Sequence, residues 1–358
     1  MTCTARSFSV SFSPATSLGG HEQLTNSCWI NGFGRIGRNF FRAVQAAKAP
    51  IEIVAVNDLG SLKTMAHLLK YDSVLGILPN AISATDDGIS VDGKTIKVLQ
   101  VRDPKELPWA SLGVDLVIES TGFFTDRDKA AAHLDAGAPH VIVSAPSNGA
   151  DATFVYGVNH SSFDPKKHKV VSNASCTTNC FVPMVKVLDD AFGIDQGLMT
   201  TVHAYTGDQQ LVDGPHSDLR RARGAAINIT PTGTGAARAT SLVLEAMKGR
   251  LDGTSLRVPV PTGSITDFVA TLKKPATKDE INAAFKAAAS GELKGILEYT
   301  DAPIVSSDIV TNPHSCVFDS ELTMSMGSLV KVLGWYDNEW GYSNRLVDLA
   351  TLIGRASR

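Results

Sequence analysis

From residue 30 onward, hydrophobic and polar positions follow the order strand, glycine-rich turn, helix, strand. Apolar side chains recur at helical spacing within Asn39–Lys48. The run Ile51–Val56 that follows is short, apolar and rich in β-branched residues, which is typical of a strand buried in a parallel sheet. Together these segments predict a βαβ unit.

The same kind of pattern continues through the first half of the chain. Buried strands are predicted at Val114–Glu119 and Val141–Ser144, a helix at Asp126–Ala136, and a β-hairpin within Ile89–Leu99 around the turn Asp92-Gly93. This half is therefore expected to be a parallel α/β unit that an antiparallel hairpin interrupts.

The second half of the chain has longer strands. Strands are predicted at Leu198–Ala204, Ser255–Pro261, Thr266–Lys273 and Leu329–Tyr336, and helices at Cys176–Asp190, Gly235–Lys248, Lys278–Ser290 and Asn344–Gly354. The alternation within Val269–Lys273 suits a sheet with one exposed face. We expect an α+β unit here, and the apolar stripe of the last helix must dock on this domain or on the first.

Composition narrows the class of protein. The 358 residues, 43% of them hydrophobic and 19% charged, suffice for about two globular domains. The net charge of −3 does not favour nucleic acid or an anionic membrane, and no apolar run is long enough for a transmembrane helix. Five cysteines without CxxC spacing argue against a disulfide scaffold and against a zinc site. A soluble protein of a reducing compartment, without a metal, is expected.

The first 27 residues differ from the rest of the chain. Met1–Gly20 is rich in Ser, Thr and Phe, has Arg6 as its one basic residue, and no acidic residue precedes Glu22. This composition is weakly similar to an organelle transit peptide, but it lacks the apolar core of a secretion signal. We expect a disordered tail or a misplaced start codon.

The motif Gly32-x-Gly34-x-x-Gly37 carries the first functional signal. Such glycines permit a tight turn and close approach to a pyrophosphate, while the following helix offers free N–H groups. Asp58 ends the next strand 21 residues after Gly37, where a carboxylate binds a ribose 2′-hydroxyl and repels a 2′-phosphate. The motif predicts NAD as cofactor. The alternative is a glycine-rich turn with a solvated aspartate.

A candidate nucleophile lies at the start of a predicted helix, where Cys176 follows Ser175, a natural N-cap. Unpaired N–H groups in a first helical turn lower the pKa of a cysteine and favour the reactive thiolate. The alternative is a small buried side chain. His203 ends a later strand and suits the base for Cys176, although on its own it is better explained as a structural histidine.

Arginines in the second half are candidate anion ligands. Arg221 and Arg257 flank the Thr- and Gly-rich stretch Thr230–Gly235, a composition that holds small phosphates. For the neighbouring Arg220 and Arg223, a solvated edge or an intersubunit ion pair is the preferred interpretation.

Together, these residues resemble the phosphorylating glyceraldehyde-3-phosphate dehydrogenase family from Ile30 to about Gly354. The resemblance rests on Asn31–Arg38, Val56–Leu59, Ser120–Gly122, Ala174–Asn179, His203–Gln209, Thr234–Ala237, Leu256–Pro259 and Trp335–Tyr342. No single motif decides it, but the ordered set is specific.

The resemblance implies an α/β fold with two domains. A Rossmann dinucleotide-binding domain is expected over 28–175, completed by a C-terminal helix within 338–358, and an α+β catalytic domain with a largely antiparallel sheet over 176–337, leaving 1–27 as the tail. The family is cytoplasmic and usually homotetrameric, with a loop near Gln209–Ile229 that reaches the neighbouring subunit's cofactor.

The resemblance also implies a role for each matching position. Cys176 corresponds to the nucleophile and His203 to its base. The NAD-binding positions are Asn31, Gly32, Phe33, Gly34, Arg35, Ile36, Gly37, Asp58, Leu59, Ser120, Thr121, Gly122, Pro215, Asn338 and Tyr342, with Asn338 at the nicotinamide carboxamide. The positions for the substrate phosphate and inorganic phosphate are Ser175, Thr177, Thr206, Asp208, Arg221, Thr234, Gly235 and Arg257.

The implied reaction oxidises a triose phosphate through a Cys176 thiohemiacetal and a thioester, which inorganic phosphate then cleaves. Three alternatives are the related erythrose-4-phosphate dehydrogenase, a thiol hydrolase without a nucleotide, and a non-catalytic NAD-binding protein. Thr206 and Thr234-Gly235 favour the triose enzyme, the Gly32–Gly37 turn disfavours the hydrolase, and the presence of both Cys176 and His203 disfavours the non-catalytic protein.

One segment departs from the family. Within Thr25–Trp29, an indole stands beside the cofactor turn where a small residue is usual. We expect Trp29 to overpack and disturb the first strand.

Overall fold

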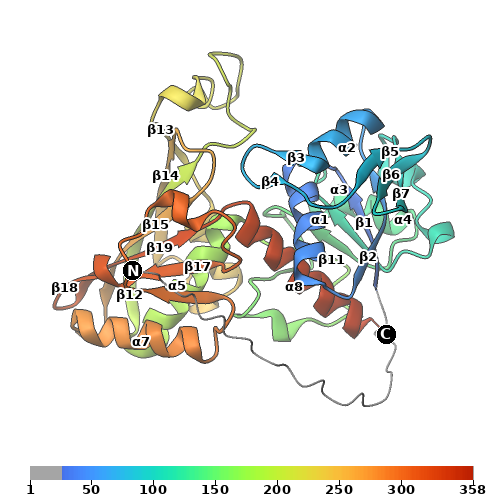
Figure 1. Ribbon diagram of the computed structural model, residues 1–358. Helices are drawn as coiled ribbons and strands as arrows, with labels where there is room; N and C mark the ends of the chain where they lie inside the picture. The colour runs from blue at the N-terminus through green and yellow to red at the C-terminus, as the bar shows by residue number, and fades with distance from the viewer. Residues whose placement is uncertain (1–25, 358) are drawn as a thin grey trace, which may run out of the picture.

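The computed structural model describes residues 26–357 and has two lobes, each built on a large β-sheet (Figure 1). Of the tail predicted over residues 1–27, residues 1–25 lie outside the described part. Helix α8 (Trp340–Ala356) returns from the second lobe to the first (Figure 1). The α/β fold class is confirmed.

The first lobe contains the predicted βαβ unit. Its elements are β1 (Asn26–Asn31), α1 (Arg35–Ala47), β2 (Ile51–Asn57), α2 (Leu62–Lys70), β3 (Tyr71–Asp72), β4 (Gly76–Ile77), β5 (Ile82–Ala84), β6 (Gly88–Val91), β7 (Lys94–Leu99), β8 (Leu116–Glu119), α3 (Arg127–Ala130), α4 (Ala132–Asp135), β9 (Val141–Val143), β10 (Ala152–Thr153) and β11 (Val170–Ser172).

Nine strands form the first sheet in the order β10-β11-β9-β8-β1-β2-β7-β6-β5. Every neighbouring pair is parallel except β7–β6 and β6–β5, which form the antiparallel excursion. Asp92 and Gly93 join β6 to β7 with φ of 51° and 84°, the positive values that a tight hairpin turn needs. The predicted hairpin is therefore confirmed, and β1 lies near the middle of the sheet.

The second lobe has the longer strands. Its elements are α5 (Cys176–Phe192), β12 (Ile194–Ala204), β13 (Thr230–Gly233), α6 (Ala236–Ala239), β14 (Leu251–Val258), β15 (Ser264–Leu272), α7 (Lys278–Ser290), β16 (Leu297–Thr300), β17 (Cys316–Asp319), β18 (Met324–Met326) and β19 (Leu329–Tyr336). The main order is β13-β14-β12-β15-β19-β17-β16, and most neighbours are antiparallel.

Buried and partly exposed side chains alternate along β15, as predicted for a sheet with one exposed face. Phe268, Ala270 and Leu272 join the core that α5 and α7 cover. Helix α8 places Leu346, Leu349 and Ile353 in the core of the first lobe instead, against α1. The last helix thus docks on the first domain.

Trp29 does not prevent the first strand from forming, since β1 pairs with both β2 and β8. The pairing with β2 shifts its register between Cys28 and Trp29, and the expected effect of Trp29 on stability stays a prediction. Trp29 is fully buried, and its ring meets that of Trp109 edge-on at 4.2 Å. The strand begins at Asn26, so residues 26 and 27, assigned to the tail, belong to the sheet.

Two predicted helices are broken. Instead of one helix over Gly235–Lys248, α6 ends at Ala239 and 3₁₀ turns follow, in which Thr240 Oγ1 bonds back to the Ala236 carbonyl at 3.2 Å. The helix predicted at Asp126–Ala136 is interrupted only at Ala131, between α3 and α4, where the dihedral angles stay helical and the Ala131 carbonyl accepts from the amides of both Leu134 and Asp135. Across residues 26–357, no helix has the length and apolar character needed to span a membrane.

Candidate active site

The candidate nucleophile and base face each other at the junction of the lobes. Cys176 is the first residue of α5 and packs against the cores of both lobes, while the Ser175 side chain caps the helix by accepting from the Thr178 amide at 3.0 Å. His203 lies near the end of β12, with its Nε2 3.3 Å from Cys176 Sγ. Tertiary structure thus brings together two residues that are 27 positions apart.

The neighbours of His203 fix its tautomer and its charge. Its Nδ1–H donates to the Ala204 carbonyl at 2.6 Å, which leaves Nε2 as the acceptor that faces the thiol. Arg257 is its register partner on β14, with Nη1 3.1 Å from Nδ1. Burial, reinforced by the charges of Arg257 and Arg221, lowers the pKa of His203 to about 3. The imidazole is therefore neutral and available as a base.

Desolvation raises the pKa of the Cys176 thiol above its usual range, although Arg257 and hydrogen bonding at Thr177 act in the opposite direction. The expected lowering of this pKa by the helix terminus is therefore wrong, because loss of solvent outweighs it. A thiol with a raised pKa thus faces the neutral His203, whose Nε2 lies 3.3 Å from Cys176 Sγ and can accept a hydrogen bond from it.

Arg257 presents an unused hydrogen-bond donor. Its Nε is buried and has no hydrogen-bond partner among the described residues, while Nη1 donates to the Ala204 carbonyl at 3.2 Å and to Thr206 Oγ1 at 3.3 Å. A buried guanidinium with a free N–H favours an anionic ligand. Thr206 and Arg257 thus lie together beside His203.

Arg221 is held by other protein groups. Its Nη1 pairs with Asp208, and its Nε donates at 3.0 Å to Thr232 Oγ1, which in turn donates to Asp218 at 2.6 Å. Asp208 therefore restrains Arg221, and its own negative charge makes it a poor phosphate ligand.

The hydroxyl groups predicted for inorganic phosphate also have protein partners. These contacts are Ser175 Oγ with the Thr178 amide (3.0 Å), Thr177 Oγ1 with Tyr336 Oη (2.9 Å) and Thr234 Oγ1 with the Ala236 amide (3.2 Å). Gly235 precedes α6 and has open space where a Cβ would lie. Phosphate binding at these positions requires the hydroxyls to share or exchange these bonds.

Tyr336 is a residue that the sequence analysis missed. It is buried on β19, with its hydroxyl between Thr177 Oγ1 and Thr201 Oγ1 at 2.9 and 2.7 Å and its ring 5.9 Å from that of His203. Tyr336 therefore ties the start of α5 to β12, which bears the base. The sequence signal for this residue was a hydroxyl-bearing side chain at the end of an otherwise apolar strand.

A cavity of about 420 Å³ lies at the carboxyl ends of β1, β2 and β8. Its lining comprises Asn31, Gly32, Gly34, Asn57, Asp58, Leu59, Val101, Arg102, Ser120, Thr121, Phe123 and Phe124. Gly32 has φ of +92°, and a Cβ there would lie 2.5 Å from the Thr121 amide nitrogen, whereas a Cβ on Gly34 would meet open space. The turn can therefore accept a pyrophosphate at Gly34, which fits NAD.

Asp58 fixes this turn from the next strand. Its carboxylate accepts from the Phe33 and Gly60 amides, both at 2.8 Å. The side chain of Arg35 does not serve the cofactor directly, because its guanidinium forms ion pairs with Asp72 and Glu339. Only main-chain groups of Arg35 and its neighbour Ile36 at the start of α1 remain to meet a pyrophosphate.

The segment before α8 approaches the Cys–His pair. Asn338 Oδ1 accepts from Ser264 Oγ at 3.0 Å, and the same Ser264 hydroxyl accepts from the Ala204 amide at 3.0 Å. Tyr342 donates to the Ala174 carbonyl at 3.1 Å and so supports the loop before Cys176. Gly122, with φ of +78°, lies between Thr121 and Phe123, which both line the cavity. Pro215 is exposed in the loop between β12 and β13 and does not line the cavity to which Leu59 belongs.

A buried polar network under the cavity was also missed. Glu119 accepts from Asn31 Nδ2 at 2.6 Å, from the Thr121 amide at 2.8 Å and from His133 Nε2 at 2.9 Å, and Trp109 Nε1 donates to His133 Nδ1 at 3.1 Å. Glu119 ends an otherwise apolar strand, which is the signal that sequence offers. Within residues 26–357, no group of three or more acidic, His or Cys side chains is arranged to hold a metal ion.

The dinucleotide-type turn with the cavity beside it, and a thiol–imidazole pair at the junction of the lobes, are features of a nucleotide-dependent enzyme. Sequence comparison gives the particular family. The glyceraldehyde 3-phosphate dehydrogenase NAD binding domain matches residues 27–127, and the C-terminal domain of the same family matches residues 175–338. The chain belongs to the glyceraldehyde 3-phosphate dehydrogenase family, as its motifs predicted.

Three curated relatives illustrate the similarity. Glyceraldehyde-3-phosphate dehydrogenase 2 of Streptomyces avermitilis is 63% identical over 332 residues, 92% of this chain and 99% of the relative. The enzyme of Streptomyces coelicolor is 64% identical over 333 residues, also 92% and 99%. That of Mycobacterium avium is 62% identical over 339 residues, 93% of this chain and all of the relative.

Proposed function

We propose that this protein oxidises glyceraldehyde 3-phosphate and transfers inorganic phosphate to the product, giving 1,3-bisphosphoglycerate with reduction of NAD, as in glycolysis. The observation that carries the proposal is the 3.3 Å contact between Cys176 Sγ and a neutral His203 Nε2 beside the cofactor cavity. Its relatives carry the same enzyme name.

The reaction begins with the neutral pair. As Cys176 Sγ bonds to the aldehyde carbon, its proton passes to His203 Nε2 and from there to the carbonyl oxygen, which becomes the hydroxyl of a thiohemiacetal and leaves His203 neutral again. His203 then accepts that hydroxyl proton as the carbon–oxygen double bond re-forms. NAD, when bound, supplies the acceptor for the hydride that leaves this carbon. A Cys176 thioester remains, which phosphate attacks to release the acyl phosphate and restore the thiol.

Cofactor contacts follow from the cavity. We infer that main-chain groups from Asn31 to Gly37 hold the pyrophosphate, that Asp58 holds the adenosine ribose, and that Ser120 and Thr121 line the opposite wall. We further infer that Leu59 contacts the adenine of NAD and that Pro215 of another copy of the chain completes the adenosine pocket. Asn338 orients the nicotinamide, with Tyr342 packed behind it.

Two anion sites serve the two phosphates. Thr206 and Arg257 suit the phosphate that the aldehyde carries, because Arg257 keeps a free buried donor. Arg221, with Thr234, Gly235, Ser175 and Thr177, suits inorganic phosphate. Asp208 is assigned the role of holding Arg221. The domain limits follow the same division, with 28–175 and 338–358 binding NAD and 176–337 carrying the catalytic residues.

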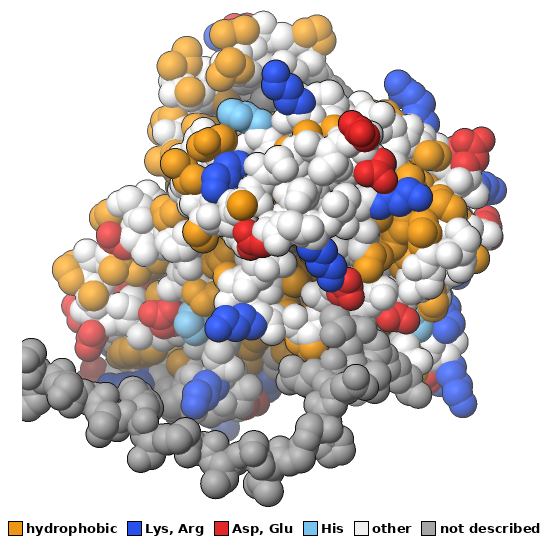
Figure 2. All heavy atoms as spheres, turned by 45° about the vertical axis from the view of Figure 1, so that its right-hand side comes forward, with side chains coloured by type: hydrophobic (Ala, Val, Ile, Leu, Met, Phe, Trp, Pro, Cys, Tyr) orange, Lys and Arg blue, Asp and Glu red, His pale blue; other side chains and the backbone are white. Residues whose placement is uncertain are grey.

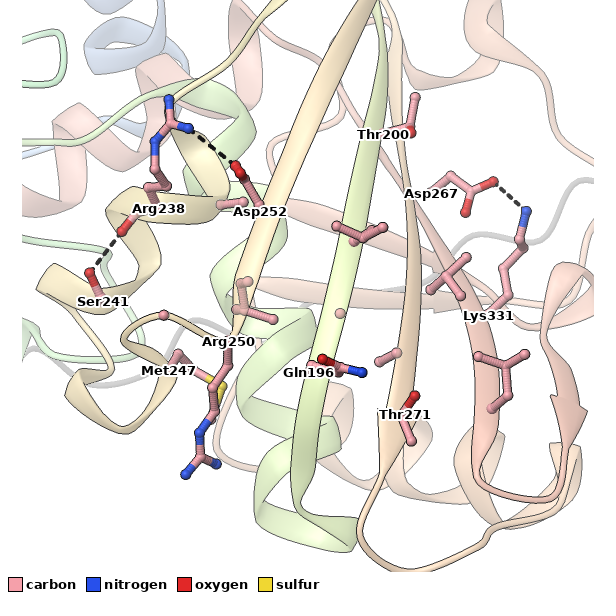
Figure 3. A pocket seen from close by; sticks show the side chains of 18 residues that line it. Gln196, Thr200, Arg238, Ser241, Met247, Arg250, Asp252, Asp267, Thr271 and Lys331 are labelled. Atoms are coloured by element: carbon pink, nitrogen blue, oxygen red, sulfur yellow. Dashed lines mark hydrogen bonds and ion pairs between the residues drawn. The ribbon is translucent and has the colours of Figure 1, made fainter.

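We also infer a cytoplasmic homotetramer. Hydrophobic side chains gather on the loop between β12 and β13 that projects at the top of the molecule (Figure 2), where Leu211 and Ile227 are 81% and 84% exposed. A second surface is the outer face of the second sheet, where both apolar and polar side chains, among them those of β12, β14, β15 and β19, line a cavity of about 930 Å³ (Figure 3). Copies of the chain would cover both surfaces.

Sedimentation velocity tests the assembly. Leu198→Asp places a charge on the outer sheet face, where Leu198 is 68% exposed, and should shift the protein to smaller species. Leu68→Asp on α2 of the first lobe is the matched control and should not. A wild-type protein that sediments as a monomer would contradict the proposal.

One assay tests the proposed reaction. NADH formation is followed with glyceraldehyde 3-phosphate, with and without inorganic phosphate, and with erythrose 4-phosphate as competing substrate. Sustained turnover should require phosphate and favour the triose. NADH formation that is indifferent to phosphate, or faster with erythrose 4-phosphate, would overturn the assignment.

A further inference from the structure

The side chain of Arg35 joins the cofactor turn to the segment that bears Asn338. Its Nε donates to Glu339 Oε1 at 2.8 Å and its Nη2 pairs with Glu339 Oε2, a two-point contact between residues 304 positions apart. The third nitrogen, Nη1, donates to Asp72 Oδ2 at 2.5 Å. Three separate parts of the chain therefore meet on one guanidinium.

Each partner of Arg35 is itself fixed. Asp72 Oδ1 accepts from the Val74 and Leu75 amides at 2.9 Å, which shapes the turn between β3 and β4. The amide of Glu339 donates to Asp337 Oδ1 at 2.9 Å, so the contact with Arg35 acts on a short, constrained segment between β19 and α8. The Glu339 and Asp72 side chains are only 15% and 3% exposed, whereas the Arg35 side chain is 36% exposed, so water screens these pairs in part.

The two residues of this contact lie near two different parts of the proposed cofactor, the pyrophosphate and the nicotinamide. The main chain of Arg35 starts α1 at the pyrophosphate turn, and Glu339 directly follows Asn338, assigned above to the nicotinamide carboxamide. We propose that Glu339 is a positioning residue that, through Arg35, sets the distance and orientation of Asn338 relative to the pyrophosphate. This inference rests on the proposed function and names a residue beyond it.

The ion pair between Arg35 and Glu339 should affect the binding of NAD more than the binding of a ligand without nicotinamide. A ligand that occupies only the pyrophosphate and adenosine positions does not need Asn338 in place, whereas one that carries nicotinamide does. Loss of the Glu339 charge should therefore weaken NAD and leave ADP-ribose unaffected. Asp72 supplies a matched control, because it contacts the same guanidinium without touching the Asn338 segment.

Calorimetric titration of the full-length protein with NAD and with ADP-ribose tests this proposal, after wild-type NAD-dependent oxidation has been measured. Glu339→Gln should raise the Kd for NAD about tenfold and slow NADH formation, with the Kd for ADP-ribose unchanged. Asp72→Asn should leave the ratio of the two Kd values at the wild-type level. Alkylation of Cys176 by iodoacetamide in the absence of NAD should proceed at the wild-type rate in both variants.

Equal weakening of NAD and ADP-ribose in Glu339→Gln, or no change in either, would overturn the positioning role. A wild-type protein without NAD-dependent activity would instead overturn the proposed function. If Glu339→Gln does not fold, Glu339→Asp keeps the charge on a shorter side chain. That variant should show the same selective loss of NAD affinity, and an unchanged Kd ratio there would count against the proposal.

Discussion

His203 and Arg257 are register partners on adjacent parallel strands, and their facing nitrogens are 3.1 Å apart. A fixed positive charge at this distance opposes protonation of the imidazole, and burial acts in the same direction. The residue proposed to bind the substrate phosphate thus also keeps the base unprotonated. Binding of an anion at Arg257 would offset part of that charge.

The His203 environment predicts a pH dependence of stability. Its pKa is about 3 in the folded protein, below the ordinary value of 6.5, so the unfolded chain binds more protons between these values. Stability is therefore lost as pH falls from 6.5 toward 3, by about 2 kcal/mol at pH 5 from this group alone. Urea denaturation of His203→Gln should show a shallower acid dependence than wild type. The variant His67→Gln, at an exposed histidine, should keep the wild-type dependence of stability on pH. If His203→Gln also keeps that dependence, the acid sensitivity does not come from His203.

Replacing the nucleophile should separate chemistry from cofactor binding. Cys176→Ser is expected to abolish NADH formation, because a hydroxyl is a far weaker nucleophile, while NAD binds as before since the Gly32–Gly37 turn is unchanged. Cys180→Ala, one helical turn along α5, should remain active. Stopped-flow absorbance of the NADH formed and titration with NAD measure the two properties. Appreciable turnover by Cys176→Ser would show that another residue is the nucleophile.

Loss of the buried guanidinium should act on the substrate. Arg257→Ala is expected to raise the KM for the aldehyde by roughly 10- to 100-fold, since a charge-assisted bond to phosphate is lost, and to change the KM for NAD far less. Arg127→Ala, which removes an ion pair with Asp151 in the first lobe, is the control. Steady-state kinetics in both substrates decides the point. Equal increases in both KM values would indicate a folding role instead.

The sequence predicts those features that depend on neighbouring residues. It does not predict those that depend on contacts between distant parts of the chain. The Gly32–Gly37 turn and the helix start at Cys176 depend on neighbouring residues, so spacing predicts them. The desolvation of Cys176, which raises its pKa where a lowering was expected, depends on packing against the cores of both lobes. The ion pairs of Arg35 likewise depend on residues 37 and 304 positions away.

Asp58 should select the cofactor. Its carboxylate lines the cavity and is held by the Phe33 and Gly60 amides, so a 2′-phosphate would meet a fixed negative charge. We expect kcat/KM for NAD to exceed that for NADP by about 100-fold or more. Asp58→Asn, which removes the charge, should narrow the difference. Equal efficiency of wild type with both cofactors would contradict this role.

Trp29 gives the last prediction, which reverses the expectation from sequence. The buried indole packs against Trp109 at 4.2 Å within a cluster that includes Leu107, Val114 and Val117, so its removal leaves a cavity beside the central strand. Trp29→Ala should cost about 3–5 kcal/mol of unfolding free energy. Trp29→Phe should cost less, because an aromatic ring remains and because Nε1 of Trp29 has no hydrogen-bond partner among the described residues to lose. Urea denaturation with and without NAD measures both variants, and a higher midpoint for Trp29→Ala would mean that the tryptophan overpacks the strand after all.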